Sequence, residues 1–333
     1  MKGFDPRFTD LPDYILKCTA QIWEGHDIAA LDWHYGDDLI VRTPAGISRG
    51  NAAGKANTMA TLSEFPDRQL LGEDVIWCGD DQSGFLSSHR IVSTATHRGG
   101  AFGPATGRQV TFRTIADTYC RDNRVWDEWL IRDNAAIAVQ LGQTAKSAAQ
   151  AMIDSGDLTP PLTPGSDVLG PYSGTGNDNE WGALHAEILQ RVMAAELAII
   201  DREYDRACCL ALPGGIEAYG TSVAQDFWMG LRSALPSATF RIEHQIGRVD
   251  PPAQHCLNMS SGRNPIHDLG NPGNVLESAT RHADLEDEGQ HHSQNQQQDK
   301  SQHESDQLIS RHRRSKDADG HIGHADQIER QQA

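Results

Sequence analysis

Aromatic residues are missing from the end of this sequence: the last one is Phe240, and residues 241–333 contain no Phe, Tyr or Trp. A segment poor in large apolar side chains cannot bury enough surface to offset the entropy lost on ordering it. We therefore expect residues 251–333, which are rich in Gln, His, Asp and Ser, to be disordered. Histidines gather there too, but they lack regular spacing and a rigid support, so we assign no metal site to them.

Paired cysteines, long apolar runs and positive charge are also scarce. The six cysteines form no C-x-x-C pair, which is typical of reduced thiols in a cytoplasmic protein. No apolar run approaches the roughly 20 residues of a membrane span, and the N-terminus carries acids where a signal peptide would be hydrophobic. With 46 acidic and 29 basic residues the net charge is −17, which disfavours nucleic acid and anionic membranes as partners.

The first half of the chain has a clear order of predicted elements. Asp10 is a plausible N-cap, with Pro12 in the first turn of the helix that follows. A short helical stretch then leads into a strand at 38–43, and Gly50 opens a helix that Pro66 closes. Four strand-like segments follow at 68–78, 83–97, 109–121 and 124–133. Helices first and an antiparallel meander afterwards predict an α+β domain rather than a parallel α/β sheet.

The second half repeats the beginning of the first. With an offset of 169 the matching residues include Asp32 and Asp201, Tyr35 and Tyr204, and Pro44 and Pro213. After one inserted residue the offset is 170, and Gly50 and Pro66 match Gly220 and Pro236. The match ends near Val249, before the long strands. We therefore predict an internal duplication with an incomplete second copy.

These observations predict four segments: a domain at 1–145, a Pro/Gly/Ser linker at 146–179, an incomplete copy at 180–250 and a disordered tail at 251–333. The incomplete copy would leave apolar helix faces uncovered. We expect it to pack on the first domain, to form a homodimer, or to be unstable.

Residues 10–140 resemble the SnoaL-like polyketide cyclases, or ester cyclases, of the nuclear transport factor 2-like superfamily. The resemblance rests on the aromatic helix pair followed by DLIVRTPAG, on the G-x-x-G-x-x-x-x-M spacing from Gly50 to Met59, on TATHRGGAFGPATGRQVTF at 94–112 and on IADTYCRDNRVWDEWLIRD at 115–133. It implies a cone-shaped fold, in which a curved antiparallel sheet wraps over helices and a pocket opens at the wide end.

The resemblance also implies a chemistry. Enzymes of the family close a ring by intramolecular aldol addition without metal or cofactor, using an acidic strand residue together with the histidine of the T-H-x-G stretch. The histidine corresponds to His97. Family members usually place the acid where this chain has Ala116, and the neighbouring Asp117 lies one position late. A one-residue slip turns a side chain to the opposite face of a sheet unless a bulge restores it. His97 and Asp117 are nevertheless the predicted catalytic pair.

Strand alternation assigns Phe85, His89 and His97 to one face, and Asp117 and Tyr119 to one face of the next strand. The predicted substrate-binding residues are Trp23, Trp33, Tyr35, Phe85, His89, Tyr119, Glu128 and Trp129. The predicted ligand is a small apolar or aromatic organic molecule. The alternatives are a non-catalytic binding module, which Ala116 favours, and a hydrolase or isomerase that uses the same pocket.

Overall fold

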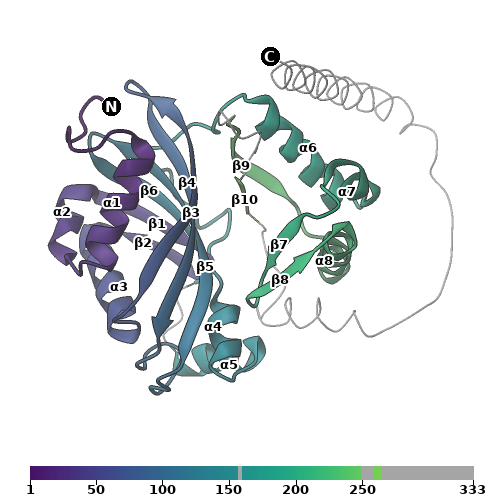
Figure 1. The fold of residues 1–333 in the computed structure, drawn as a ribbon, viewed down its shortest axis with the longest axis horizontal. Coiled ribbons are helices and arrows are strands. Elements are labelled where there is room, and N and C mark those ends of the chain that lie inside the picture. The colour runs from purple at the N-terminus through teal and green to yellow at the C-terminus, as the bar shows by residue number, and fades with distance from the viewer. Residues whose placement is uncertain (157–159, 249–258, 264–333) are drawn as a thin grey trace, which may run out of the picture. The chain divides into compact units, whose positions relative to one another are not determined.

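A six-stranded sheet with helices is the centre of the first part of the chain (Figure 1). The computed structural model describes residues 1–156, 160–248 and 259–263. The elements of the first part are α1 (Leu11–Trp23), the short 3-10 helix η1 (Ile28–Ala30), α2 (Leu31–His34), β1 (Tyr35–Thr43), β2 (Gly46–Arg49), α3 (Asn51–Glu64), β3 (Gln69–Asp80), β4 (Gly84–Thr96), β5 (Gln109–Arg121), β6 (Arg124–Arg132), α4 (Asn134–Gln140) and α5 (Ala145–Ser155). The predicted α+β class is confirmed.

The strand order of this sheet is β2-β1-β6-β5-β4-β3. The four long strands pair antiparallel in sequence order, as the meander predicted. β1 instead pairs in parallel with β6, so the first strand lies beside the last strand of the meander. No helix in the described part of the chain combines the length and apolar character needed to cross a membrane.

Local sequence signals explain where two of the helices begin. Asp10 is the N-cap of α1, and its Oδ1 accepts a hydrogen bond of 2.8 Å from the Asp13 backbone N–H. Gly50 precedes α3 with φ +83°, a conformation that any other residue would adopt at a cost. Its N–H donates to the Leu39 carbonyl at 2.7 Å, which ties the start of α3 to β1.

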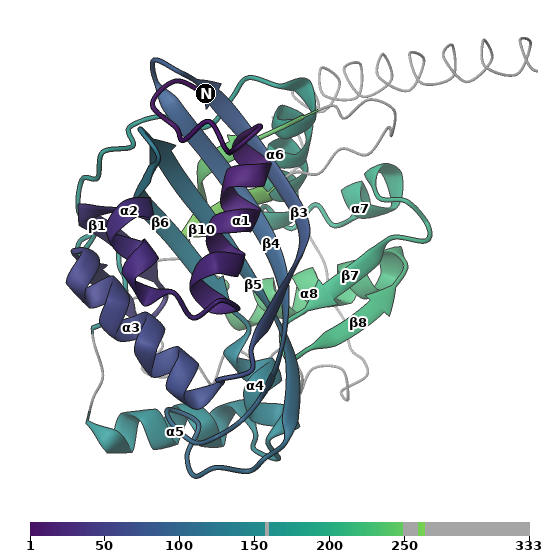
Figure 2. The ribbon, with the colours of Figure 1, turned by 60° about the vertical axis from the view of Figure 1, so that its left-hand side comes forward.

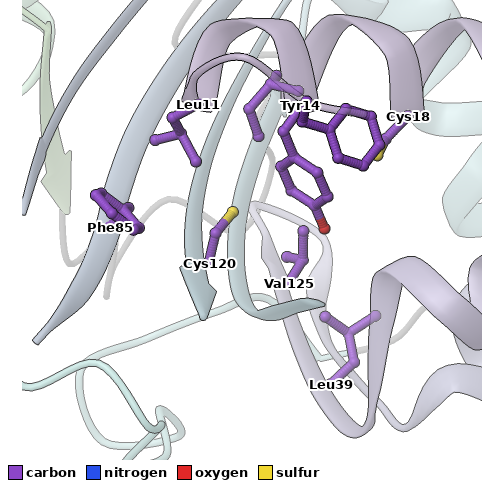
Figure 3. Close-up of a cluster of buried hydrophobic side chains, with 9 residues drawn as sticks. Leu11, Tyr14, Cys18, Leu39, Phe85, Cys120 and Val125 are labelled. Carbon is purple, nitrogen blue, oxygen red and sulfur yellow. The ribbon is translucent and has the colours of Figure 1, made fainter. Parts of the chain in front are cut away.

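The first apolar core lies between the sheet and the helices. Figure 2 shows α1 and α3 in front of one face of the sheet, and we call this the inner face. At one end of it, Leu11, Tyr14 and Cys18 of α1 pack with Cys120 of β5 (Figure 3). A second cluster at the other end joins Phe65, Phe102, Val110, Phe112 and the apolar side of α4. The helices therefore hold the sheet at both ends of its inner face.

Part of the predicted linker is helical. α5 lies at Ala145–Ser155 and overlaps the predicted range 146–179 from its second residue onward. Its sequence AKSAAQAM is rich in alanine, the strongest helix former. Thr144 and Ser147 form a reciprocal capping box at its start, and Gly156 ends it in a left-handed conformation. The prediction of an irregular segment is wrong here, because the alanines favour a helix and the prolines and glycines begin only after it.

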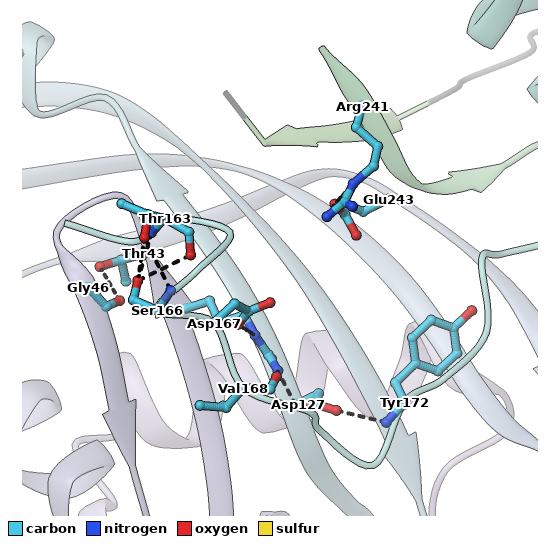
Figure 4. Close-up of polar contacts among 11 residues, drawn as sticks. Thr43, Gly46, Asp127, Thr163, Ser166, Asp167, Val168, Tyr172, Arg241 and Glu243 are labelled. Carbon is cyan, nitrogen blue, oxygen red and sulfur yellow. Dashed lines mark hydrogen bonds and ion pairs between the residues drawn. The ribbon is translucent and has the colours of Figure 1, made fainter. Parts of the chain in front are cut away.

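The rest of the linker is tied to the opposite, outer face of the sheet by a buried ion pair. Arg42 Nη1 donates to Asp127 Oδ1 at 2.9 Å, and the two side chains are 2% and 0% exposed. Arg42 Nε donates to Asp167 Oδ1 and its Nη2 to the Val168 carbonyl, both at 2.8 Å. The second carboxylate oxygen of Asp127 accepts from the Tyr172 N–H at 2.8 Å (Figure 4). We call these contacts the Arg42 network.

The elements after the linker follow the same order as those at the beginning. They are α6 (Glu180–Met193), α7 (Ala198–Glu203), β7 (Cys209–Leu212), β8 (Ile216–Tyr219), α8 (Thr221–Ala234) and β9 (Arg241–Ile246), with β10 (Met259–Arg263) paired to β9. Gly220 precedes α8 with φ +99°, and its N–H donates to the Cys208 carbonyl at 2.9 Å. Gly50 makes the same contact to Leu39. The duplication stays a prediction, which this shared turn supports.

The predicted disordered tail falls mostly outside the described residues. Only Met259–Arg263 is described, and its backbone pairs with β9. The expectation of disorder stays a prediction for the tail.

Candidate functional site

The alternation of β5 decides which residues face the helices. Phe112 and Cys120 belong to the clusters that pack on the helices, so Thr114, Ala116 and Thr118 share the inner face with them. Asp117 and Tyr119 alternate with these residues and therefore lie on the outer face. The strand is regular from 109 to 120 in its pairing with β4, so no bulge restores Asp117 to the inner face.

The pairing of β4, β5 and β6 arranges the inner-face residues in three rows that run across the strands. Ser87, Thr118 and Glu128 are cross-strand neighbours in the first row, and the Ser87 and Thr118 hydroxyl oxygens lie 2.7 Å apart. His89, Ala116 and Leu130 form the middle row, and Ile91, Thr114 and Arg132 form the third. A small residue thus lies at the centre of a surface whose edges carry ionisable side chains.

Glu128 is the carboxyl group of this surface. It is partly buried, and burial raises its pKa to about 7. Among the described residues no hydrogen-bond donor contacts its carboxylate. Tyr35 on β1 lies near enough for the Glu128 charge to add to burial in raising the pKa of the tyrosine. Glu128 can therefore take up or release a proton near neutral pH, which is a requirement for general acid–base catalysis.

His89 is the imidazole of the middle row. It is 3% exposed, and burial lowers its pKa to about 4, so the ring is neutral at physiological pH. Its Nε2 is buried and has no hydrogen-bond partner. A buried polar atom without a partner is costly in a folded protein, and a catalytic role is one of the reasons for which it is kept.

The predicted catalytic pair is not brought together. His97 lies just beyond the end of β4, fully buried, with its Nδ1 at 3.1 Å from Thr106 Oγ1 and its Nε2 at 3.3 Å from Glu64 Oε1. Asp117 is on the outer face, where it accepts a hydrogen bond from Ser88 Oγ and lies opposite Trp129. The sheet therefore separates the two side chains, because they belong to opposite faces.

The remaining predicted residues divide in the same way. Tyr35, His89 and Glu128 belong to the inner surface, and Trp23 contacts it through Arg68. Phe85 is part of the apolar core. Tyr119 and Trp129 are on the outer face, where they contact Tyr172. Trp33 is 71% exposed and contributes to neither surface.

Sequence reasoning missed two arginines on the inner face. Arg68 precedes β3 and is 5% exposed, with its guanidinium 4.7 Å from the centre of the Trp23 ring. Arg132 is the cross-strand neighbour of Thr114. The alternation of β6 could have assigned Arg132 to the same face as Glu128. No pattern in the sequence indicates that Arg68, which directly follows a turn, is buried.

A separate surface hollow of about 250 Å³ lies between α6 and β9, lined by Thr175, Ala186, Gln190, Ile242, Glu243, His244 and Gln245. It contains none of the predicted site residues. Glu128, His89 and Arg132 are ionisable side chains of the inner face, and we take that face as the candidate site.

The burial of Asp117 on the outer face predicts that the free energy of unfolding depends on pH. Burial raises its pKa from 3.8 to about 6, so between these values the folded state holds a proton that the unfolded state has lost. Stability therefore falls as the pH rises through this window, by about 3 kcal/mol in total. Asp117→Asn removes the ionisation and keeps an oxygen that accepts from Ser88. We expect the variant to unfold at higher urea concentration than the wild type at about pH 8, with the difference vanishing at about pH 3, below the pKa of the unfolded state. A difference independent of pH would contradict this explanation.

The comparisons with known proteins concern the first part of the chain. Residues 14–141 match the family model described as SnoaL-like polyketide cyclase. The predicted resemblance is confirmed over this segment, and its helices and antiparallel-rich sheet have the nuclear transport factor 2-like architecture that the resemblance implies. A comparison with curated proteins gives no match.

Similar solved structures cover the same part of the chain. IdmH from Streptomyces antibioticus is 24% identical, over 40% of this chain and 99% of that one, with a TM-score of 0.35. TsrD from Streptomyces laurentii is 21% identical, over 38% and 92%, with a TM-score of 0.34. A SnoaL-like polyketide cyclase from Agrobacterium tumefaciens is 19% identical, over 40% and 100%, with a TM-score of 0.33.

Proposed function

We propose that the SnoaL-like segment, residues 14–141, is a cofactor-independent enzyme of the cyclase type that closes a ring in a small, largely apolar organic molecule by intramolecular aldol addition. Glu128 acts as its acid and base, in place of the predicted Asp117. One observation carries the proposal: Glu128 and Ala116 share the inner face, while Asp117 faces the other way. The acid absent from position 116 of β5 is thus replaced by one on the neighbouring strand.

The reaction needs a proton removed next to a carbonyl group, and later returned. The Glu128 carboxylate accepts the proton from carbon, and the resulting enolate carbon attacks a second carbonyl carbon of the same molecule. A carbon–carbon bond forms, the attacked carbonyl becomes an alkoxide, and Glu128 returns the proton to it. A pKa of about 7 suits both transfers, because neither protonation state is strongly favoured at neutral pH.

His89 is suited to hold the substrate oxygen. Its neutral ring has an unpartnered Nε2 on the inner surface, which can make one hydrogen bond to a carbonyl or enolate oxygen. β4 and β6 are separated by β5, and the two residues are one row apart, so the backbones of His89 and Glu128 lie about 12 Å apart on the sheet. Ala116 lies between them in the register, and its methyl side chain is the smallest of the middle row.

The proposal is tested by incubating the full chain with aromatic esters that carry a poly-β-ketone side chain able to close a six-membered ring. Aldol addition conserves mass, so the product is identified by chromatography and by its changed absorbance. We expect kcat/KM to rise about tenfold per pH unit below about pH 7 and to level off above it, because the base must be ionised. Ring closure at the uncatalysed rate, or a rate independent of pH between 5 and 8, would reject the proposal.

A second candidate function is a non-catalytic module that binds the same kind of molecule. Ala116 at the family's acid position favours it. Binding of the esters without ring closure, and with equal affinity in the wild type and in Glu128→Gln, would make this the better account.

A further inference from the structure

Arg68 is a buried cation without an anionic partner. Its side chain is 5% exposed, yet its Nε and Nη2 both donate to the same neutral atom, Ser93 Oγ, at 3.1 and 3.0 Å. The guanidinium also lies 4.7 Å from the ring centre of Trp23 and 5.2 Å from that of Phe112. Among the residues that the structure describes, no carboxylate lies within ion-pair distance of it. Burying a charge is costly unless it is paired.

A second positive charge increases this imbalance. Burial, together with the positive charge of Arg132, lowers the pKa of Arg68 to about 9, so the two guanidinium groups repel each other across the inner face. Arg68 is still protonated at neutral pH. Glu64 is the acidic group that acts on Arg132, but its Oε1 is already held by the Phe102 N–H at 2.9 Å and lies 3.3 Å from His97 Nε2.

Unpartnered hydrogen-bonding atoms lie on the same part of the inner face. Thr114 is 3% exposed, its Oγ1 is buried without a partner, and it is the cross-strand neighbour of Arg132. His89 Nε2 is buried without a partner in the next row. Arg68, Arg132, Thr114 and His89 therefore belong to the same face of the sheet, with the Trp23 ring beside Arg68. The Arg132 Nε donates to Asn134 Oδ1 at 2.8 Å, which leaves its two terminal nitrogens for a ligand.

We propose that Arg68, with Arg132 and Thr114, binds the carboxylate of a planar, conjugated organic acid, which lies across Ala116 toward Glu128. The fork of N–H groups on a guanidinium matches the two oxygens of a carboxylate, and the Trp23 ring provides an apolar wall for the conjugated part of the molecule. The inference rests on the proposed function and adds the substrate class to it: the molecule carries a free acid group remote from the carbon that Glu128 deprotonates.

The test compares two probes of nearly the same shape, the anion 2-naphthoate and the neutral 2-naphthamide, by titration calorimetry with the full chain. We expect the wild type to bind the acid at least about tenfold more tightly than the amide, as for a charge-assisted pair in a partly desolvated site. Arg68→Met keeps an apolar side chain and removes the charge, so the ratio of the two affinities should fall to about one. Equal affinities in the wild type, no binding of either probe, or an unchanged ratio in Arg68→Met would overturn the inference.

Two controls separate this inference from the proposed function. Arg113 is an arginine of the outer face, paired with Glu73 and Glu217, so Arg113→Met should leave the affinity ratio of the probes unchanged. Glu128→Gln should abolish ring closure and still prefer the acid over the amide. If Glu128→Gln stays active while the acid preference holds, the acid–base assignment fails and the anion site survives. If Arg68→Met does not fold, the inference is judged from two other results: the ratio of the two probe affinities in the wild type, and the affinity of Thr114→Val for the acid, which should be severalfold weaker.

Discussion

Replacing Glu128 with glutamine is expected to lower kcat for ring closure by about 10² to 10⁴-fold, which is the contribution of a positioned general acid–base. The amide has nearly the same shape as the carboxyl group but cannot take up the proton. Because Glu128 has no hydrogen-bond partner among the described residues, the exchange disturbs no contact, and substrate binding should change little. The measurement is kcat and KM for the ester substrate, together with the pH profile.

Asp117→Asn is the matched control for this prediction. It changes the same chemical group, with a pKa also raised by burial, on the adjacent strand but on the opposite face. We expect its kcat to stay within about twofold of the wild type, since nothing on the outer face touches the substrate. The opposite result, in which Asp117→Asn is inactive and Glu128→Gln is active, would restore the assignment that the sequence suggested.

Truncation of Asp127 to alanine is expected to lower the free energy of unfolding by about 3 to 5 kcal/mol, the usual loss when one partner of a buried ion pair is removed. Arg42 would keep its charge at 2% exposure, with the ion pair to Asp167 and the hydrogen bond to the Val168 carbonyl left to offset it. The Tyr172 N–H would lose its acceptor as well. Urea denaturation of the full chain, followed by tryptophan fluorescence, measures the effect.

Two further variants show whether the uncompensated charge causes this loss. Asp167→Ala removes the partner that is 15% exposed, so water replaces part of the contact and the loss should be smaller, about 1 kcal/mol. The pair Arg42→Met with Asp127→Leu removes both charges and should recover much of the stability. A loss below about 1 kcal/mol in Asp127→Ala would mean that water already reaches the Arg42 network.

Most of the fold could be predicted because local chemistry and tertiary structure agree. Asp10 and Gly50 mark the starts of α1 and α3, and the turn residues between the long strands give the meander with ends within about two residues. The parallel pairing of β1 with β6 could not be predicted. It joins segments about 90 residues apart, and no local pattern in either strand indicates its neighbour.

The candidate site was harder to predict than the fold, because the identity of the acidic residue depends on a difference of one position along β5. The sequence shows that Ala116 and Asp117 are adjacent, and alternation states that only one of them can face the helices. Deciding which one requires the pairing of β5, in which Phe112 and Cys120 face the helices. Glu128 and Arg68 are inner-face groups for a related reason: their burial depends on residues far along the chain, such as Ser93 for Arg68.

The outer face of the sheet is covered by residues from the second half of the chain, and this limits where the protein can be truncated. Ile76, Leu86 and Trp129 of the sheet share a buried cluster with Ile246 and Tyr172, which lie beyond residue 145. A fragment that ends at residue 145 would lack these covering residues, so the apolar side chains of the outer face would be exposed to solvent. Such a fragment should aggregate at concentrations at which the longer chain stays monodisperse. This aggregation would be a consequence of the truncation and not an intrinsic instability of residues 14–141.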